Sequence, residues 1–385
     1  MTFDVLIIGG CLVGASLAAA LKSGGLNMAL VETQPIPPSG EGWDNRMYAI
    51  SPGGADFLTQ CDAWQQLDKN RVQPVETMRV FGDEGTELDF SAYQLGVPEL
   101  AFILENRLLQ QALWQGLQTQ SNLTLFYPAH CASLVWNQEA AHLQLQDGRT
   151  LNAKLVVGAD GGNSWVRQQA GIVAPPTLYN QHGVVANFTV EKPHRATAFQ
   201  WFQPDGILAL LPLPQQMVSM VWSVSTERAQ VLLQLSPEEL CTEVATASHY
   251  KLGKLQLVTP PAAFPLRLLS LPQIIKPRLA LVGDAAHNIH PLAGQGVNLG
   301  FRDARQLAHV LLHRDVQSDC GNIRLLRRYE RSRKEDVLSM LLTTDLLKKL
   351  FNNSDPLLRK ARNVGLAATN RIAALKKMLA RHALN

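Results

Sequence analysis

The sequence is poor in features that would hold a metal ion or a disulfide framework. Its 385 residues contain five cysteines, which lie far apart and form no CxxC pair. It also has no HExxH motif and no nucleophile elbow. A metal site is therefore not expected, and the unpaired cysteines are typical of a protein in a reducing cytosol. The five are Cys11, Cys61, Cys131, Cys241 and Cys320.

The overall charge is also small. The formal net charge is +3, so the composition indicates no nucleic-acid partner. Hydrophobic residues make up 46% of the chain and charged residues 17%, which predicts a large buried core rather than a disordered chain. The length suggests about two or three domains.

Long apolar runs are scarce, and the one that stands out is Val5 to Leu21. Three glycines interrupt these seventeen residues, and Asp4 precedes them where a signal peptide would have basic residues. A membrane-spanning helix needs about 20 apolar residues. We therefore expect this run to belong to the fold and not to a targeting or transmembrane segment.

The same run predicts a βαβ unit. Phe3–Ile8 is β-branched and apolar and ends at two glycines, as a buried parallel strand does. Leu12–Lys22 is alanine-rich and predicts a helix, and Met28–Val31 predicts a second strand.

Later segments extend this pattern and then depart from it. Strands are expected at Leu151–Gly158 and Leu279–Val282, and helices at Arg107–Leu117 and from about Val297 to His313. Ile207–Leu211 and Met217–Val224 lie between turn residues and predict an antiparallel hairpin sheet. The predicted fold class is α/β: a Rossmann-like domain with an inserted sheet-rich substrate domain and a C-terminal helical tail. The expected boundaries are 1–70, 104–171 and 274–345 for the first domain, 71–103 and 172–273 for the second, and 346–385 for a basic helical region.

A glycine-rich turn follows the first predicted strand. In a dinucleotide fingerprint, the first glycine permits the tight turn and the last lets the helix pack on the strand, while the helix N-terminus faces a diphosphate. Glu32, eighteen residues after Gly14, could accept hydrogen bonds from a ribose. The alternative is an ordinary glycine-rich βα turn. The turn reads Gly9-Gly10-Cys11-Leu12-Val13-Gly14.

Cys11 departs from the fingerprint. It stands where the template has its middle glycine, at the point where backbone and diphosphate come closest. The added Cβ and sulfur predict weakened, but not abolished, nucleotide binding.

Two further glycine-rich segments follow predicted strands. In the first, Ser164 or Asn163 could simply cap a helix. In the second, Asp284 could hold a ligand hydroxyl, and backbone amides at the start of the Val297 helix could stabilise a negatively charged edge of a bound cofactor ring. The two segments are Gly158-Ala159-Asp160-Gly161-Gly162-Asn163-Ser164 and Gly283-Asp284-Ala285-Ala286-His287, the latter continued by Pro291 and Gly294-Gln295-Gly296-Val297-Asn298.

In this order and spacing the three motifs resemble the FAD-dependent monooxygenases of the p-hydroxybenzoate hydroxylase type, and within them the ubiquinone-biosynthesis hydroxylases. The resemblance runs from about Thr2 to about Tyr329. It implies that Glu32 binds the adenosine ribose, that Arg46 and Arg107 contact FAD, and that Asp284 binds the ribityl chain. The residues implied in cofactor binding are Gly9, Gly10, Cys11, Gly14, Glu32, Arg46, Arg107, Asp160, Asp284, Pro291, Gly294, Gln295, Gly296, Val297 and Asn298.

The resemblance also implies a reaction. NAD(P)H or another donor would reduce the FAD, and a flavin C4a-hydroperoxide formed with O2 would hydroxylate a (poly)prenylated phenol in ubiquinone biosynthesis. No catalytic side chain can be named from the sequence. His287 and His290 are more typical of residues that satisfy local backbone groups, and aromatic residues on inserted strands are at least as often core as pocket. Those aromatic residues are Trp201, Phe202 and Trp222.

The last forty residues are strongly basic. From Leu346 to Asn385 nine lysines and arginines face one acid, Asp355, against a net charge of +3 for the whole chain. Three interpretations remain open: a helix on an anionic membrane, helices packed on the first domain, or a surface for a partner protein of a ubiquinone-biosynthesis complex. The resulting hypothesis is a cytoplasmic protein that contacts the inner face of the membrane peripherally.

Two other functions compete with this one. The first is a monooxygenase or reductase for another aromatic or isoprenoid substrate. The second is a non-catalytic, lipid-binding subunit that has lost catalysis through Cys11. Retention of Asp160, Asp284 and the Gly294–Asn298 turn favours a working enzyme.

Overall fold

A computed structural model describes most of the chain. The described residues are 1–36, 40, 42–82, 87–173, 177–203, 206–288, 296–315 and 317–351, without the side chains of 177–179 and 341–351. Pro291, Gly294, Gln295, His290 and the tail beyond residue 351 lie outside these ranges.

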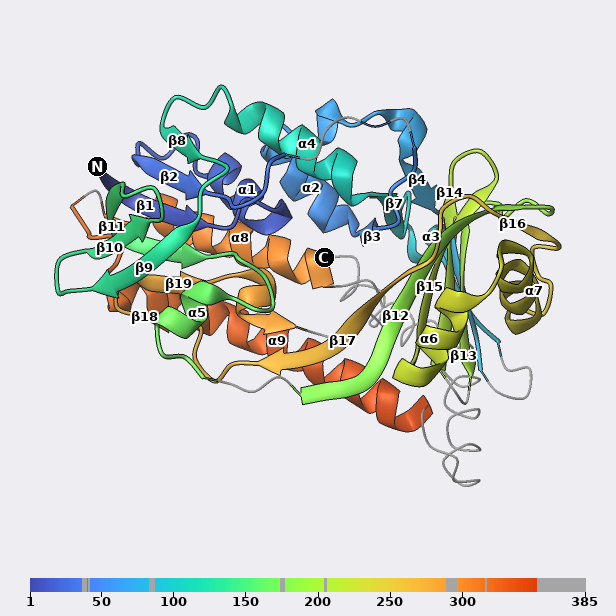
Figure 1. Cartoon of the computed structure of the whole chain (residues 1–385). Coiled ribbons are helices and arrows are strands. Elements are labelled where there is room, and N and C mark those ends of the chain that lie inside the picture. The colour runs from blue at the N-terminus through green and yellow to red at the C-terminus, as the bar shows by residue number, and fades with distance from the viewer. Residues whose placement is uncertain are drawn as a thin grey trace.

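The first sheet has eight strands and is built around a parallel core. Its parallel strands lie in the order β19-β11-β1-β2-β8, and helices α1, α4 and α8 belong to this part of the molecule (Figure 1). Antiparallel strands β18, β10 and β9 extend it. The strands are β1 (Thr2–Ile8), β2 (Met28–Val31), β8 (Leu123–Phe126), β9 (Cys131–Trp136), β10 (Ala141–Leu145), β11 (Thr150–Gly158), β18 (Ile275–Lys276) and β19 (Leu279–Leu281), and the helices α1 (Leu12–Ala20), α4 (Asn106–Leu117) and α8 (Gly296–Leu312).

The strand register places the three glycine-rich motifs together. Ile8 at the end of β1 pairs with Val31 of β2 and with Gly158 of β11, and Gly158 pairs with Leu281 of β19. The carboxyl ends of these four strands therefore coincide, so the loops that follow β1, β11 and β19 meet at one edge of the sheet. In open α/β sheets this edge is where ligands bind.

The second sheet has nine strands and carries α6 and α7 on one face (Figure 1). Strands β12 to β15 pair antiparallel, whereas β13 pairs with β5 in parallel. Trp222 and Leu208 lie in the hydrophobic core on the helix side of this sheet. The elements are β5 (Thr77–Phe81), β6 (Glu87–Ser91), β12 (Thr177–Val190), β13 (Thr197–Gln203), β14 (Gly206–Leu213), β15 (Met217–Ser225), β16 (Leu255–Leu257), β17 (Ala262–Ser270), β20 (His287–Asn288), α6 (Thr226–Gln234) and α7 (Pro237–Ala247).

A three-stranded sheet, β3-β7-β4, supplies further residues to the site. The long helix α9 packs on α8 and runs along the outside of the first sheet (Figure 1). None of the described helices is long and apolar enough to cross a membrane. The remaining elements are β3 (Met47–Ile50), α2 (Pro52–Gln60), β4 (Gln73–Val75), α3 (Ala92–Leu95), β7 (Ala101–Glu105), α5 (Trp165–Gln169) and α9 (Ile323–Phe351).

The α/β class and the antiparallel hairpin sheet are confirmed. The expected βαβ unit is present as β1, α1 and β2, with the helix ending at Ala20 rather than Lys22. The sequence did not predict the three-stranded sheet, nor that β12 runs for fourteen residues.

Candidate cofactor and substrate site

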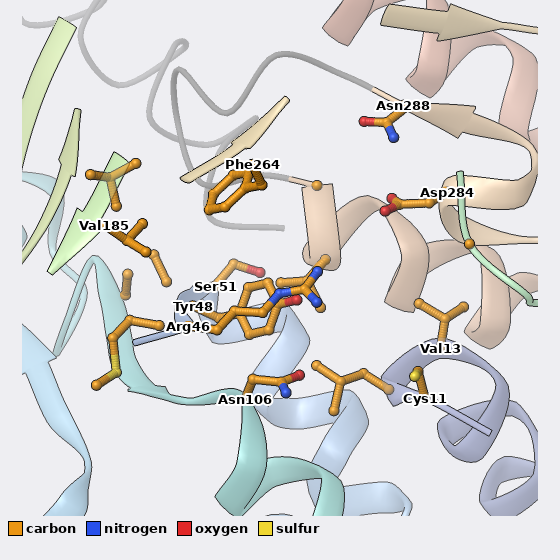
Figure 2. A pocket seen from close by; sticks show the side chains of 18 of the residues that line it. Cys11, Val13, Arg46, Tyr48, Ser51, Asn106, Val185, Phe264, Asp284 and Asn288 are labelled. Carbon is orange, nitrogen blue, oxygen red and sulfur yellow. The ribbon is translucent and has the colours of Figure 1, made fainter. Parts of the chain in front are cut away.

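A cavity of about 750 Å³ lies where the first sheet, the three-stranded sheet and the second sheet meet. Figure 2 shows Cys11 and Asp284 on one side of it, Val185 and Phe264 on another, and Arg46 with Tyr48 between them. Its size falls in the range of small-molecule and cofactor sites. All three sequence motifs reach its wall, through Gly9, Asp160 and Asp284 among others.

The β1–α1 turn can be built only with glycine at two positions. Gly9 has φ +104°, and a Cβ there would lie 2.4 Å from the carbonyl oxygen of Ala159. A Cβ on Gly14 would lie 1.9 Å from the carbonyl oxygen of Gly9. Because both neighbours are backbone atoms, no side-chain rearrangement could relieve these contacts. Here the glycines bring helix α1 against the β1 and β11 loops, as the sequence predicted.

Glu32 is fixed at the end of β2 by this turn. Its Oε2 accepts a hydrogen bond from the Gly10 amide at 2.6 Å, and its Oε1 accepts one from the Gln34 amide at 2.9 Å. Trp114 Nε1 donates to the Gly10 carbonyl at 2.7 Å. The carboxylate therefore lines the cavity in a set orientation and keeps lone pairs for a further donor, which suits a ribose hydroxyl.

Cys11 is the N-cap of α1 and needs no unusual backbone geometry. Its φ of −69° and ψ of −169° are open to any residue, and its side chain makes no capping hydrogen bond. The thiol is exposed to the cavity. Its surroundings nevertheless raise its pKa, first through burial and then through Glu32, so the thiol stays protonated. The cysteine thus alters the wall of the cavity and not the path of the chain.

The second motif forms a cap for the short helix α5. Ser164 is the N-cap, as one sequence interpretation held, and its Oγ accepts from the Arg167 amide at 3.0 Å. Asp160 accepts from Ser164 Oγ at 2.5 Å and from the Val166 amide at 3.0 Å. Burial raises the pKa of Asp160 against these hydrogen bonds. Asp160 therefore combines a structural role with a place in the cavity wall.

The third motif presents Asp284 to the cavity. Burial raises the pKa of its carboxyl, and the nearby His287 and Arg46 only partly oppose this. No hydrogen bond joins the Asp284 carboxylate to another described residue, while its neighbour Gly283 donates to buried Asp303 at 2.8 Å. A carboxylate that lines the cavity and has no bonded partner among the described residues is suited to hold a ligand hydroxyl.

His287 is part of a buried network and does not line the cavity. Its Nε2 donates to Asp303 Oδ2 at 2.6 Å, and Arg333 Nε donates to Asp303 Oδ1 at 2.6 Å. Burial opposes ionisation of Asp303, but His287 and Arg333 outweigh it and lower its pKa. The network ties α8 and α9 to the third motif. The expectation that His287 satisfies local backbone groups is wrong, because its ring bonds to the side chain of Asp303, sixteen residues away on α8.

The start of α8 meets the cavity through Gly296 and Val297. Asn298 is instead buried, where its Oδ1 accepts from the Ser51 amide at 2.9 Å and its Nδ2 donates to the Ala49 carbonyl at 2.8 Å. It holds the N-terminus of α8 against the β3–α2 turn. Its side chain does not line the described cavity wall, so its role beside a flavin ring stays a prediction.

Of the two arginines expected at the cofactor, Arg46 lines the cavity. Its guanidinium lies 5.4 Å from the centre of the Tyr48 ring, and its pKa is raised, first by Tyr48 and also by Asp284. Burial raises the pKa of Tyr48 to about 12. Arg107 does not line the described cavity wall and instead donates to the carbonyls of Gly40 and Gly42. Its neighbour Asn106 does line the wall.

The second sheet closes the cavity with a mostly apolar face. Val185, Val221, Ala209 and Gln200 lie opposite one another on four adjacent strands, β12, β15, β14 and β13. Because side chains alternate along a strand, the next residues point to the other face. Trp201 and Trp222 accordingly lie in the core on the helix side of the sheet. Phe202 shares the face of Gln200 but packs in a separate core cluster with Ile207, so none of the three aromatic residues is in the described cavity wall, as their more conservative interpretation held.

Several residues of the wall escaped the sequence analysis. They are Tyr48, Asn106, Gln200, Ser223 and Phe264. Gln200 could have been noticed, because it is the one polar residue in the run Phe199 to Phe202. Tyr48 and Phe264 lie in two further segments that resemble the same family, Asn45–Ser51 and Phe264–Leu266, but the sequence assigned no role to them.

The fold and the site together define a class of protein. A doubly wound sheet presents a glycine turn, a fixed carboxylate and a helix N-terminus to one end of a cavity, which are the parts that bind an adenine dinucleotide. Its other end is apolar and faces an inserted sheet. The residues present fit a dinucleotide cofactor whose reactive ring would meet an apolar substrate.

Comparison with known proteins identifies the family. The model of the FAD binding domain family matches residues 2–341, so the chain belongs to this family. It is 37% identical to 3-demethoxyubiquinol 3-hydroxylase of Escherichia coli (strain K12), over 99% of this chain and 98% of that protein. It is 33% identical to the mitochondrial ubiquinone biosynthesis monooxygenase COQ6 of Homo sapiens, over 98% and 91% respectively. The chain is an FAD-dependent monooxygenase.

Solved structures show the same fold. PqsL, a probable FAD-dependent monooxygenase from Pseudomonas aeruginosa, superposes with a TM-score of 0.80 at 21% identity, over 96% of this chain and all of that one. The p-nitrophenol 4-monooxygenase PnpA from Pseudomonas putida DLL-E4 gives a TM-score of 0.80 at 16% identity, over 100% and 99%.

Proposed function

We propose that this protein hydroxylates the ring of a phenol with a polyprenyl substituent, as a step of ubiquinone biosynthesis. The observation that carries the proposal is the cavity, which joins a dinucleotide site to an apolar sheet face. A ring with a long hydrocarbon substituent matches that face, since burying apolar surface drives such binding. Relatives with 32–37% identity are named 3-demethoxyubiquinol 3-hydroxylase, ubiquinone hydroxylase and ubiquinone biosynthesis monooxygenase.

The chain's own residues hold and shield the cofactor. When bound, FAD supplies the redox chemistry that activates O2, with NAD(P)H as a transient reductant. Glu32 would accept a ribose hydroxyl, the α1 N-terminus would face the diphosphate, and Asp284 would hold the ribityl chain. Backbone amides of Gly296 and Val297 at the start of α8 would stabilise negative charge on the ring. We propose that the three segments 1–70, 104–171 and 274–345 together form this cofactor domain.

The apolar sheet face has a second task in this proposal. By covering the reacting ring it keeps water away from a reactive oxygen species and orients the substrate carbon toward it. None of the described residues is required to act as a nucleophile.

The experiment is substrate-dependent oxygen uptake by the FAD-loaded protein with a reduced nicotinamide donor. Polyprenyl phenols should stimulate uptake and yield hydroxylated product, and soluble phenols should not. Activity only on soluble aromatics would favour a monooxygenase for another aromatic substrate. Failure to bind FAD would favour the non-catalytic subunit.

We further propose that the protein docks on an anionic membrane through α9. Five cations lie on one exposed side of this helix at spacings of three and four residues, and none forms an ion pair with a described residue. We call them the basic stripe: Arg324, Arg327, Arg328, Arg331 and Lys334. A groove of about 500 Å³ is lined by its four arginines and Glu330.

The arrangement is unfavourable without an anionic partner. Like charges four residues apart on a helix destabilise it, as do cations near its N-terminus, where the helix dipole is positive. Phosphate groups of an anionic bilayer would offset both effects, at about 1 kcal/mol for each cation near the surface. The basic tail that begins at Leu346 follows the stripe in the chain and extends the same charge.

Sedimentation with phosphatidylglycerol vesicles tests this docking. Replacing the four arginines of the stripe by glutamine should release most of the protein from the vesicles. The control replaces four exposed cations elsewhere and should leave binding unchanged: Lys69, Arg149, Lys192 and Lys254 to glutamine. Equal binding of both variants would refute docking through α9, and equal binding of a chain lacking 357–385 would refute a role for the tail.

A further inference from the structure

Two polar side chains interrupt the apolar sheet face of the cavity. Gln200 on β13 and Ser223 on β15 both line it, yet their exposed fractions are only 6% and 5%. Neither side chain forms a hydrogen bond with another described residue. Their surroundings on the same face are hydrocarbon: Val185, Ile207, Ala209, Leu211, Val221 and Phe264.

A buried amide or hydroxyl that lacks a hydrogen bond lowers the stability of the fold. Apolar residues would be more stable at both positions, and apolar residues do occupy Ala209 and Ile207, which lie between them on β14. Both groups also point into a cavity that a ligand can reach. Their polarity is therefore explained by a ligand and not by the fold.

The sheet register fixes how the two groups are spread. Gln200 lies opposite Ala209, which lies opposite Val221; Ser223 is the next residue on the same face of β15. The two polar groups are thus separated by the full width of β14, with Ala209 and Ile207 between them. Ala209 leaves room above the sheet, so a flat ring placed there would have a hydrogen-bonding group on each of two sides.

We propose that Gln200 and Ser223 are the hydrogen-bonding anchors that orient the substrate ring, with Gln200 bonded to the phenolic oxygen. The ligand class is a phenol that carries a second oxygen substituent on its ring and a hydrocarbon chain. The Gln200 carboxamide can accept a hydrogen bond from a phenol O–H and donate one to an oxygen substituent of the ring. The Ser223 hydroxyl can also donate or accept. This inference rests on the proposed function and names the groups that would set which ring carbon is hydroxylated.

The first test removes the carboxamide and retains its bulk. Gln200→Leu should lower kcat/KM for the phenol by about tenfold or more, mainly through KM, because a site built to hydrogen-bond loses its partner. It should also divert reducing equivalents from product to hydrogen peroxide, since a loosely held ring is hydroxylated less efficiently. FAD affinity should not change. The control is Gln203→Leu on the same strand, whose amide bonds to the Ala247 carbonyl at 2.7 Å.

The serine offers a closely matched pair. Ser219 and Ser223 both lie on β15, both are buried, and neither hydroxyl has a described partner, but Ser219 does not line the described cavity wall. Ser223→Ala should weaken phenol binding several-fold, and Ser219→Ala should leave it unchanged. A purely structural effect of removing a buried hydroxyl would appear in both variants.

Binding is measured by the change in flavin absorbance as the phenol is titrated into the FAD-loaded protein, so the result does not depend on turnover. If wild-type protein binds and hydroxylates the phenol but Gln200→Leu and Ser223→Ala behave like wild type, this inference is wrong and the proposed function stands. If no phenol perturbs the flavin of wild-type protein, both are wrong.

Discussion

At the scale of single residues, Cys11 shows what sequence comparison with a motif can and cannot establish. The sequence identified the departure from glycine correctly, and its effect on the cofactor stays a prediction. The backbone at Cys11 requires no glycine, in contrast to Gly9 and Gly14, whose Cβ atoms would meet backbone. Only the coordinates separate a position where glycine is a geometric necessity from one where it provides space.

We predict that Cys11→Gly tightens FAD binding by about 1 kcal/mol, the order of a typical single-site effect. The reason is that the thiol faces the cavity beside the amides of α1. Cys11→Ala separates the sulfur from the Cβ and should recover part of the gain. Equilibrium titration with FAD measures both, and equal or weaker binding of Cys11→Gly would rule out crowding by the thiol.

Asp284 is a residue that is proposed to bind the cofactor but does not stabilise the fold. Its pKa is raised by burial, so its ionisation costs stability once the pH exceeds the ordinary aspartate value. This cost grows as the pH rises through that value and is fully present above the folded pKa. The resemblance placed Asp284 at a flavin, but its position on the cavity wall and its lack of a bonded partner among the described residues came from the structure.

We therefore predict opposite effects of Asp284→Asn on stability and on binding. The FAD-free protein should become more stable at neutral pH, and the gain should vanish below the ordinary pKa of aspartate. FAD binding should weaken. Urea unfolding at several pH values and FAD titration measure the two effects, with exposed Asp56→Asn on α2 as control. A less stable variant at neutral pH would contradict the assignment.

At the scale of elements, the strands that the sequence predicted best are those of the parallel sheet. β2 and β19 are apolar throughout, and β1 and β11 close with the apolar runs Val5–Ile8 and Leu155–Val157 before a glycine, a pattern that burial on both faces produces. β12 was missed because polar residues such as Gln181, His182 and Asn187 hide its periodicity. In β13 both faces are buried, so Gln200 was not recognised as facing a cavity.

The glycines of two helices give a matched prediction. Gly14→Ala places a Cβ against the Gly9 carbonyl and should cost about 3 kcal/mol or more, with loss of FAD binding. Gly116→Ala on α4 meets no atom within 4 Å and should stabilise the protein by up to about 1 kcal/mol. Denaturant midpoints compare the two. A tolerated Gly14→Ala would show that the turn is not as close as described.

At the scale of the whole molecule, one cavity is built from segments distant in sequence. The loops after β1, β11 and β19 meet because their strands end in register, and the sequence predicted this convergence from the motifs. How the second sheet closes the cavity was not predictable, because it depends on pairings such as that of β13 with β5 across more than a hundred residues.

The central claim is that this cavity brings a flavin and an apolar phenol together for hydroxylation. The measurement that tests it most directly is turnover of a polyprenyl phenol by the FAD-loaded protein under isotopically labelled dioxygen, followed by mass spectrometry of the product. The account predicts that the label appears in a new ring hydroxyl and that the reduced nicotinamide donor is oxidised as the product forms. Consumption of donor and oxygen without a labelled product would contradict it.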